Sequence, residues 1–206
     1  MLGTGESNPL KRDFKLETDY ILRELEDEGK RPSLLLHCCC GPCAAYVIEY
    51  LAGHFAIALL FYNPNIQPQD EYLKRLHGMR ELVLKSPWNV FVMECDYDEE
   101  RFNEAVKGLE REPEGSERCT ACFRLRLHDT ANRAAKSGFE TFCTTLSVSP
   151  RKDTARINEI GFELEAQFGV KWLPSDFKKR DGYKRSSQLA LEYGLYRQNY
   201  CGCRFA

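Results

Sequence analysis

The stretch SLLLHCCCGPC, residues 33–43, places an apolar run directly before a turn that carries four cysteines. A short apolar run bounded by turn residues predicts a buried strand. Apolar residues at helical spacing resume near residues 43–52, so the cysteines lie at a strand-to-helix junction. Thiols crowded at such a junction suit a disulfide framework, a thiol redox pair or a metal site.

The same alternation continues along the chain. Short apolar runs predict strands at 33–37, 56–62, 89–95, 141–146 and 170–173. Helical spacing predicts helices at 14–28, 43–52, 69–85, 98–109, 121–136, 153–168 and 184–193. This order predicts an α/β fold, with a parallel sheet of about five strands covered by helices on both faces. We expect residues 1–12 to form a disordered tail, and 13–206 a single domain with a helical, cysteine-bearing C-terminal extension.

Chemically active side chains follow the predicted strands. In open α/β sheets the ligand crevice lies outside the carboxyl ends of the strands. The residues at those ends are Cys38–Cys43, Tyr62–Asn65, Cys95–Tyr97, Thr144–Thr145 and Pro174–Asp176. The sequence therefore predicts that cysteines, carboxylates and small polar groups converge on one edge of the sheet.

Composition limits the function classes. The formal net charge of −2 predicts no general affinity for nucleic acid, so any such site must be a local patch. No apolar run approaches the roughly 20 residues that span a bilayer, and no secretory signal is visible, so we expect a cytoplasmic protein without a membrane partner. Most of the ten cysteines are clustered rather than spread, which argues against a disulfide scaffold.

A second cysteine pair, Cys119 and Cys122, is predicted to open the helix that follows Glu112–Arg118. Two loops that each present two sulfurs suit a tetrahedral metal site or an iron–sulfur cluster. A structural zinc site would leave Cys201 and Cys203 without a role, so the spacing favours an iron–sulfur cluster. The frame Cys40-Gly41-Pro42-Cys43 also matches a dithiol redox motif, but that reading leaves the other clustered cysteines unexplained.

Several motifs occur together and in order from Ser33 onward. They are His37-x-Cys39-Cys40-x-Pro42-Cys43, Phe61–Ile66, Cys119-x-x-Cys122-Phe123-x-x-Arg126-Leu127, Ser175–Lys179, Gly182-Tyr183-x-Arg185-Ser186 and Tyr196–Cys203. On these motifs the chain resembles the QueH-type epoxyqueuosine reductases. The resemblance implies a HUP-like (Rossmann-like) fold and reduction of the epoxide of epoxyqueuosine, in the wobble position of tRNA, to queuosine without cobalamin.

The resemblance also implies the residues that carry the chemistry. It implies a 4Fe–4S cluster on four thiolates, those of Cys39, Cys40, Cys119 and Cys122. It implies a redox-active Cys201–Cys203 pair and a second iron held by cysteine and aspartate, for which Cys43 and Asp96 are the candidates by position. Spacing alone favours Cys40 with Cys43 over the adjacent pair, so the ligand set among these three cysteines stays open.

A basic run with one aromatic residue follows the last predicted strand, on the presumed ligand edge. Its candidate tRNA contacts are Lys178, Lys179, Arg180, Tyr183 and Arg185, with Tyr62 and Asn63 as further substrate-contact candidates. The electron donor is not identified by the sequence, and His37 fits a proton donor or a structural residue equally well. Two other classes of function remain: a metal-free cytosolic thiol–disulfide oxidoreductase, and a zinc-stabilised tRNA-binding module.

Overall fold

The computed structural model describes residues 12–206. The predicted tail at residues 1–11 lies outside the described residues, whereas Arg12 forms an ion pair with Glu17 at 2.5 Å. The chain forms one five-stranded sheet in which every pairing is parallel. Its strands are β1 (Ser33–His37), β2 (Ala56–Phe61), β3 (Phe91–Glu94), β4 (Thr141–Thr144) and β5 (Lys171–Trp172). The predicted α/β fold is confirmed.

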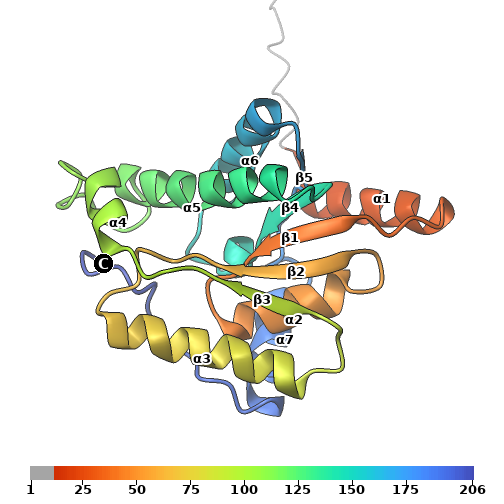
Figure 1. Cartoon of the computed structure of the whole chain (residues 1–206), viewed down its shortest axis with the longest axis horizontal. Coiled ribbons are helices and arrows are strands. Elements are labelled where there is room, and N and C mark those ends of the chain that lie inside the picture. The colour runs from red at the N-terminus through yellow and green to blue at the C-terminus, as the bar shows by residue number, and fades with distance from the viewer. Residues whose placement is uncertain (1–11) are drawn as a thin grey trace, which may run out of the picture.

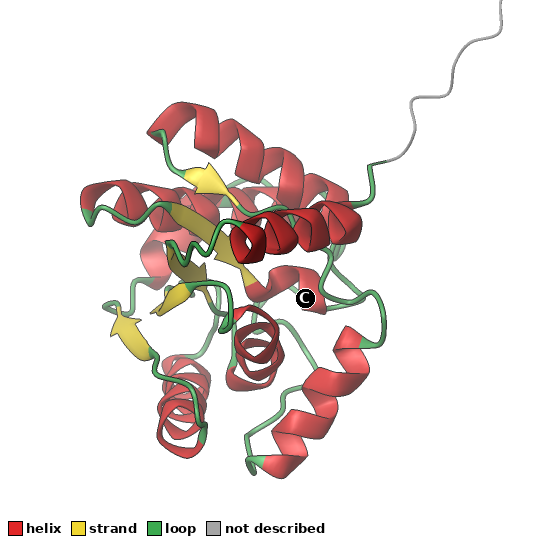
Figure 2. Ribbon diagram, turned by 90° about the vertical axis from the view of Figure 1, so that its right-hand side faces the viewer, coloured by secondary structure: helices red, strands yellow, loops and turns green. Residues whose placement is uncertain are grey.

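Helices cover both faces of this sheet (Figures 1 and 2). The helices are α1 (Phe14–Asp27), α2 (Gly41–Leu51), α3 (Gln69–Lys85), α4 (Glu99–Ala105), α5 (Glu117–Lys136), α6 (Thr154–Phe168) and α7 (Gly182–Glu192), with a 3₁₀ turn η1 (Thr145–Val148). Successive side chains of a strand point to opposite faces, so Leu34 and Leu36 pack with α1, α2, α3 and α7, whereas Leu35 packs with α5 and α6. The core therefore has two layers, one on each side of the sheet.

The strand order β3-β2-β1-β4-β5 places the first strand at the centre. Leu36 of β1 pairs with Leu59 of β2 on one side and with Cys143 of β4 on the other. The chain thus winds outward from β1 in one direction and then returns to continue from β4 in the other. This reversal makes the carboxyl ends of β1 and β4 the expected position of a ligand crevice.

The structure differs from the predicted boundaries in a few places. The two edge strands, β3 and β5, are shorter than predicted because each pairs with a neighbour on one side only. Residues 145–146 were predicted as strand but belong to η1, where the Thr144 side chain accepts a hydrogen bond from the Leu146 backbone. Helix α5 begins at Glu117, so Cys119 and Cys122 both lie near its N-terminus.

Candidate active site

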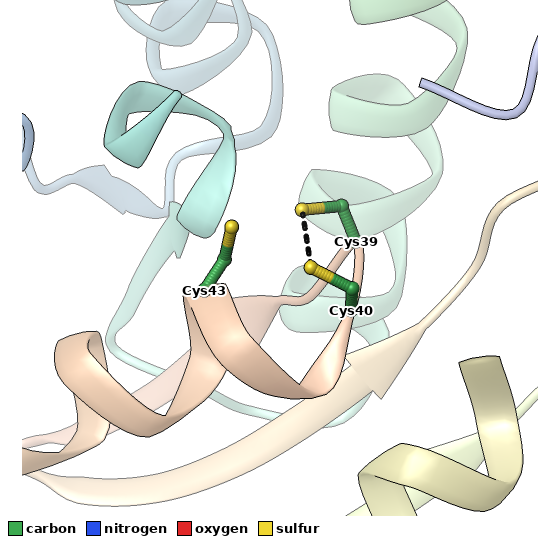
Figure 3. Close-up of side chains that lie close together, drawn as sticks. All are labelled: Cys39, Cys40 and Cys43. Carbon is green, nitrogen blue, oxygen red and sulfur yellow. Dashed lines mark hydrogen bonds between the residues drawn. The ribbon is translucent and has the colours of Figure 1, made fainter. Parts of the chain in front are cut away.

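Three cysteines meet at the carboxyl end of β1. Cys39 and Cys40 follow the strand and Cys43 lies in the first turn of α2, and their Sγ atoms all lie within 4.8 Å of one another (Figure 3). The Sγ atoms of Cys39 and Cys40 are 3.8 Å apart. The Cys39 backbone N–H donates to Thr145 Oγ1, at the start of η1, at 3.2 Å. The thiols therefore lie where the winding of the sheet reverses.

Hydrogen bonds among the three thiols give them different pKa values. Hydrogen bonds from Cys40 and Cys43 hold the pKa of Cys39 well below its usual range. The bond between Cys39 and Cys40 raises the pKa of Cys40 to about 12, and the bond between Cys39 and Cys43 raises the pKa of Cys43. One thiolate supported by two thiols is a good starting point for a metal ligand, because the thiolate is the form that binds metal.

A cavity of about 410 Å³ opens in front of these thiols. Beside it lies a narrow cavity of about 20 Å³, lined by Cys119, Cys122, Cys201 and Cys203. Four residues line both cavities: Glu114, Arg126, Lys152 and Cys201. Cysteines from three separate segments of the chain are thereby gathered around two adjoining spaces. Of the residues predicted to converge at the strand ends, Cys39, Cys40, Pro42, Cys43 and Asn65 line these cavities.

The C-terminal cysteines reach this region on a segment that has no helix or strand. Arg75 of α3 donates from Nη1 to the Cys201 carbonyl at 3.0 Å and from Nη2 to the Tyr200 carbonyl at 3.4 Å. The Gln67 backbone N–H donates to the Gly202 carbonyl at 2.9 Å. Gly202 has φ of +97°, a conformation that favours glycine, so it allows the turn between the two cysteines.

Cys201 and Cys203 are both free thiols in this structure. A hydrogen bond from Cys203 lowers the pKa of Cys201 to about 5, and the same bond raises the pKa of Cys203. The backbone N–H of Cys203 also points to Cys201 Sγ at 3.4 Å. At neutral pH this pair holds a thiolate beside a thiol, which is the arrangement needed for thiol–disulfide exchange.

Comparison with known proteins shows to which family the chain belongs. The family model described as "Epoxyqueuosine reductase QueH" matches residues 34–206. The chain belongs to the QueH family of epoxyqueuosine reductases. It is 41% identical to the epoxyqueuosine reductase QueH of Streptococcus pyogenes serotype M1 over 200 residues, covering 93% of this chain and 78% of that protein. It is 39% identical to the Thermotoga maritima protein of the same name, covering 84% of this chain and 90% of that protein.

Membership of the QueH family makes the chain an enzyme, an oxidoreductase, and confirms the resemblance on which its motifs were interpreted. None of the helices within residues 12–206 is long and apolar enough to cross a membrane. The motif cysteines at 39, 40, 43, 119, 122, 201 and 203 all line one or both of the two cavities.

The structure does not bring Asp96 into the thiol group. Asp96 is exposed and follows the edge strand β3, which β2 separates from the central strand β1. The only carboxylate side chain among the residues that line the two cavities is that of Glu114, which forms an ion pair with Lys152 at 3.4 Å.

The fold places the residues of the basic run in different surroundings. Tyr183 lines the large cavity, whereas the four candidate cations of the run do not. Each of those cations lies near a carboxylate: Lys178 with Asp176 at 3.7 Å, Lys179 with Asp13 at 2.8 Å, Arg180 with Asp19 at 2.8 Å and Arg185 with Glu49 at 2.7 Å. Lys179 and Arg180 remain largely exposed at the surface that precedes α7.

Three polar residues at the strand ends, His37, Tyr62 and Asn63, are buried. His37 forms two hydrogen bonds, one between Nδ1 and Thr144 Oγ1 at 2.8 Å and one from Nε2 to the Tyr62 carbonyl at 3.1 Å. Its burial lowers its pKa to about 3. Its imidazole is therefore neutral and satisfied, which favours the structural reading over the proton donor. Asn63 is fully buried, and neither Tyr62 nor Asn63 lines the cavities.

The large cavity is also lined by five cations, Arg75, Arg126, Arg151, Lys152 and Arg197. Arg126 and Arg197 belong to the motifs of the sequence, whereas Arg75, Arg151 and Lys152 were not among its candidate site residues. The pair Arg151–Lys152 follows η1 at the carboxyl edge, and Arg126 lies one helical turn after Cys122, so position along the predicted elements could have indicated both. Arg126 is only 3% exposed, so its guanidinium lies inside the molecule rather than at the surface.

Proposed function

We propose that this chain reduces the epoxide of epoxyqueuosine in the wobble position of tRNA, giving queuosine. The convergence of cysteines from the β1–α2 junction, α5 and the C-terminus on two adjoining cavities carries this proposal. Family membership supplies the substrate class. Conversion of an epoxide to an alkene and water consumes two electrons and two protons, so a site for this reaction needs a source of both.

The donor set fits a thiolate-bound metal centre. We propose that Cys39, Cys40, Cys119 and Cys122 hold a 4Fe–4S cluster, because thiolates are the usual ligands of such clusters. The cations Arg126 and Lys152, which line both cavities, suit the negative charge that four thiolates bring. When bound, a cluster of this kind supplies electrons singly, and the proposed second iron supplies a Lewis acid for the epoxide oxygen.

For the second iron we propose Cys43, whose Sγ lies beside those of Cys39 and Cys40. The sequence proposal of Asp96 as its partner receives no support from the geometry, since Asp96 is exposed beyond β2. A hard oxygen ligand at this position would suit a single iron ion.

We propose that Cys201 and Cys203 deliver electrons from an external donor that is not yet identified. In this step two thiols lose two electrons and two protons and form one disulfide bond, which the external donor then reduces. The position of Cys201, which lines both cavities, supports this role. Arg75 positions the pair beside the cavities, because it donates to the Cys201 carbonyl.

The large cavity suits a nucleotide. Tyr183 and Tyr200 are exposed at 45% and 41% and both line it, so each can stack on an unpaired base. Arg151 and Arg197 line it as well and form no ion pair within the part of the chain that the structure describes. We propose these four residues as the contacts to the wobble nucleotide and its phosphates, with Lys179 and Arg180 as contacts further along the anticodon arm.

The decisive experiment uses anaerobically purified protein and tRNA from cells that accumulate epoxyqueuosine. We expect the visible absorbance of an iron–sulfur cluster, and conversion of the nucleoside to a product that has lost one oxygen by mass spectrometry. A metal-free protein active on model disulfides would instead identify a thiol–disulfide oxidoreductase. A colourless, zinc-containing and inert protein that binds tRNA would identify a binding module.

A further inference from the structure

Arg126 is a buried cation without a carboxylate partner. Its side chain lies on α5, and the residue is only 3% exposed. Nη2 donates to Asn63 Oδ1 at 2.5 Å, Nη1 points to Cys122 Sγ at 3.9 Å, and Nε has no hydrogen-bond partner. No Asp or Glu of residues 12–206 forms an ion pair with it.

Two other buried arginines have different partners. Arg75, which is also 3% exposed, forms an ion pair with Glu71 at 2.7 Å. Arg118 also has no ion pair among the described residues and an unpartnered Nε, but it donates to the Glu110 carbonyl at 2.9 Å and lies over the ring of Phe205, with no hydrogen bond to sulfur. Burying a charge without a partner is costly, and such a charge persists where a counter-ion belongs to the site. The surroundings of Arg126 contain sulfur atoms where a carboxylate would be expected.

Arg126 and Lys152 are the two cations that line both cavities, and of these two Arg126 is the one with a hydrogen bond to a cysteine sulfur. It lines the large cavity together with Cys39, Cys40 and Cys43, and the narrow one together with Cys119 and Cys122. Asn63 fixes the guanidinium from behind, because its Nδ2 donates to the Cys38 carbonyl at 2.9 Å. The cation is thereby tied to the backbone of the cysteine loop itself.

We infer that Arg126 is the counter-charge of the thiolate-bound centre and raises its reduction potential. The inference rests on the proposed function, which supplies that centre. Reduction adds negative charge to the centre, so a fixed cation in a low-dielectric site stabilises the reduced form more than the oxidised one. Arg126 contacts a proposed ligand and is held by Asn63, so its charge acts at a defined place.

The test is a spectroelectrochemical titration of the iron chromophore in full-length protein that has been reconstituted anaerobically. Arg126→Gln removes the charge, and we expect a more negative midpoint potential. Asn63→Asp keeps the arginine but loses the donor to the Cys38 carbonyl and places a carboxylate against the guanidinium, and we expect a shift in the same direction. Arg126→Lys keeps the charge, and we expect a potential close to that of the wild type.

Arg133→Gln is the matched control. Arg133 lies two turns further along α5 and forms an ion pair with Asp129 at 2.5 Å, so its removal should leave the potential unchanged. A purely structural role for Arg126 would lower metal content without moving the potential of the iron that remains. Iron-loaded Arg126→Gln and Asn63→Asp proteins that titrate at the wild-type potential, or at a more positive one, would overturn the inference.

A second measurement does not depend on redox chemistry. Without metal the buried cation is uncompensated, so Arg126→Met should melt at or above the wild-type Tm in the metal-free protein. Metal loading should then raise the Tm of this variant by less than it raises that of the wild type. An equal rise in both proteins would contradict the counter-charge role. Wild-type protein that holds no iron would overturn the proposed function together with this inference. Unchanged potentials or equal Tm rises in iron-loaded variants would overturn the inference alone.

Discussion

Two regions bring thiols to the same cavity by different means. The loop at residues 38–43 is fixed by backbone structure, because it joins the central strand β1 to α2 and most of its residues are buried. The C-terminal segment at residues 196–206 forms no helix or strand and is held by a few contacts, chiefly the side chain of Arg75 and one backbone hydrogen bond from Gln67. The ring of Phe205 lies 6.5 Å from that of Phe102 of α4, beside which the chain ends (Figure 1).

This difference separates two kinds of function. A group set by the fold itself suits a permanent metal centre, since its geometry persists as long as the sheet does. A group held by a few side-chain contacts can be released, reduced and returned without unfolding the core. The comparison therefore predicts that mutations in the first region remove the metal, whereas mutations in the second remove turnover and leave the metal in place.

The largest effect is expected for Cys39→Ala. Loss of a proposed ligand leaves the thiolate shell incomplete, so iron and epoxide-reducing activity should both fall to background. Iron analysis and the nucleoside assay measure this. Cys38→Ala is the matched control, because Cys38 lies in the same loop but is fully buried and its thiol donates to the Leu36 carbonyl. Full iron content in Cys39→Ala would remove this residue from the ligand set.

Cys201→Ser and Cys203→Ser should give the next largest effect. Each variant loses the ability to form the disulfide, so it should retain iron and bind tRNA, complete at most one turnover and then stop. Pre-steady-state product formation followed over several enzyme equivalents distinguishes one turnover from many. Less iron in these variants would show instead that the segment ligates metal, and unchanged steady-state rates after deletion of residues 199–206 would exclude any role.

The sequence predicted the first region far better than the second. Apolar runs and helical spacing located all five strands and placed Cys39 and Cys40 at the carboxyl edge, because these signals are local. The attachment of residues 200–202 to Arg75 and Gln67 joins positions more than a hundred residues apart, and no local pattern encodes it. Arg126 was visible as part of a motif, but its burial and its missing carboxylate partner emerge only from the packing of α5.

The basic run shows the same limit. Its clustering from Lys178 to Arg185 indicated a shared surface, yet the turn before α7 directs Lys179 and Arg180 toward acids of the α1 region. Arg180 and Asp181 both have positive φ there, at 50° and 64°, which turns the chain sharply. Only Tyr183, in the first turn of α7, lines the cavity with the cysteines.

Arg75→Met should have an intermediate effect. It removes the donors to the Tyr200 and Cys201 carbonyls, so the C-terminal cysteines lose their fixed position. Misplacement of a reacting group by about 1 Å can cost about 10²-fold, so we expect a kcat reduction of roughly 10- to 100-fold with normal iron content. Limited proteolysis should cut near residue 200 sooner than in the wild type.

The control for this variant is Arg80→Met on the same helix. Arg80 is exposed and forms an ion pair with Glu94 at 2.6 Å, away from the C-terminal segment. Its loss should leave kcat and the proteolysis rate near wild type, within the small range of ordinary surface substitutions. Equal kinetics and equal proteolysis for both variants would mean that the C-terminal segment does not need its clamp.

The smallest effect is expected on tRNA affinity. The test compares two cations of the large cavity, Arg151 and Arg197, with two of the basic run, Lys179 and Arg180. Each cation that neutralises a phosphate adds roughly 0.7 to 0.9 to the slope of log affinity against log salt. Arg151 donates to the Asn199 carbonyl and Arg197 to the Tyr183 hydroxyl, and neither forms an ion pair in the described chain, so both are available to phosphates. Arg151→Gln with Arg197→Gln should therefore lower the slope by about one to two.

Lys179→Gln with Arg180→Gln removes the same formal charge and serves as the comparison. These two cations already face Asp13 and Asp19, so a phosphate must compete with a carboxylate for each of them. We expect a smaller change of slope for this pair, and none in iron content for either double variant. Tyr183→Ala should weaken binding by about 1 to 3 kcal/mol through lost stacking, with the salt slope unchanged. A larger slope change for the Lys179 and Arg180 pair would move the main tRNA contact from the cavity to the basic run.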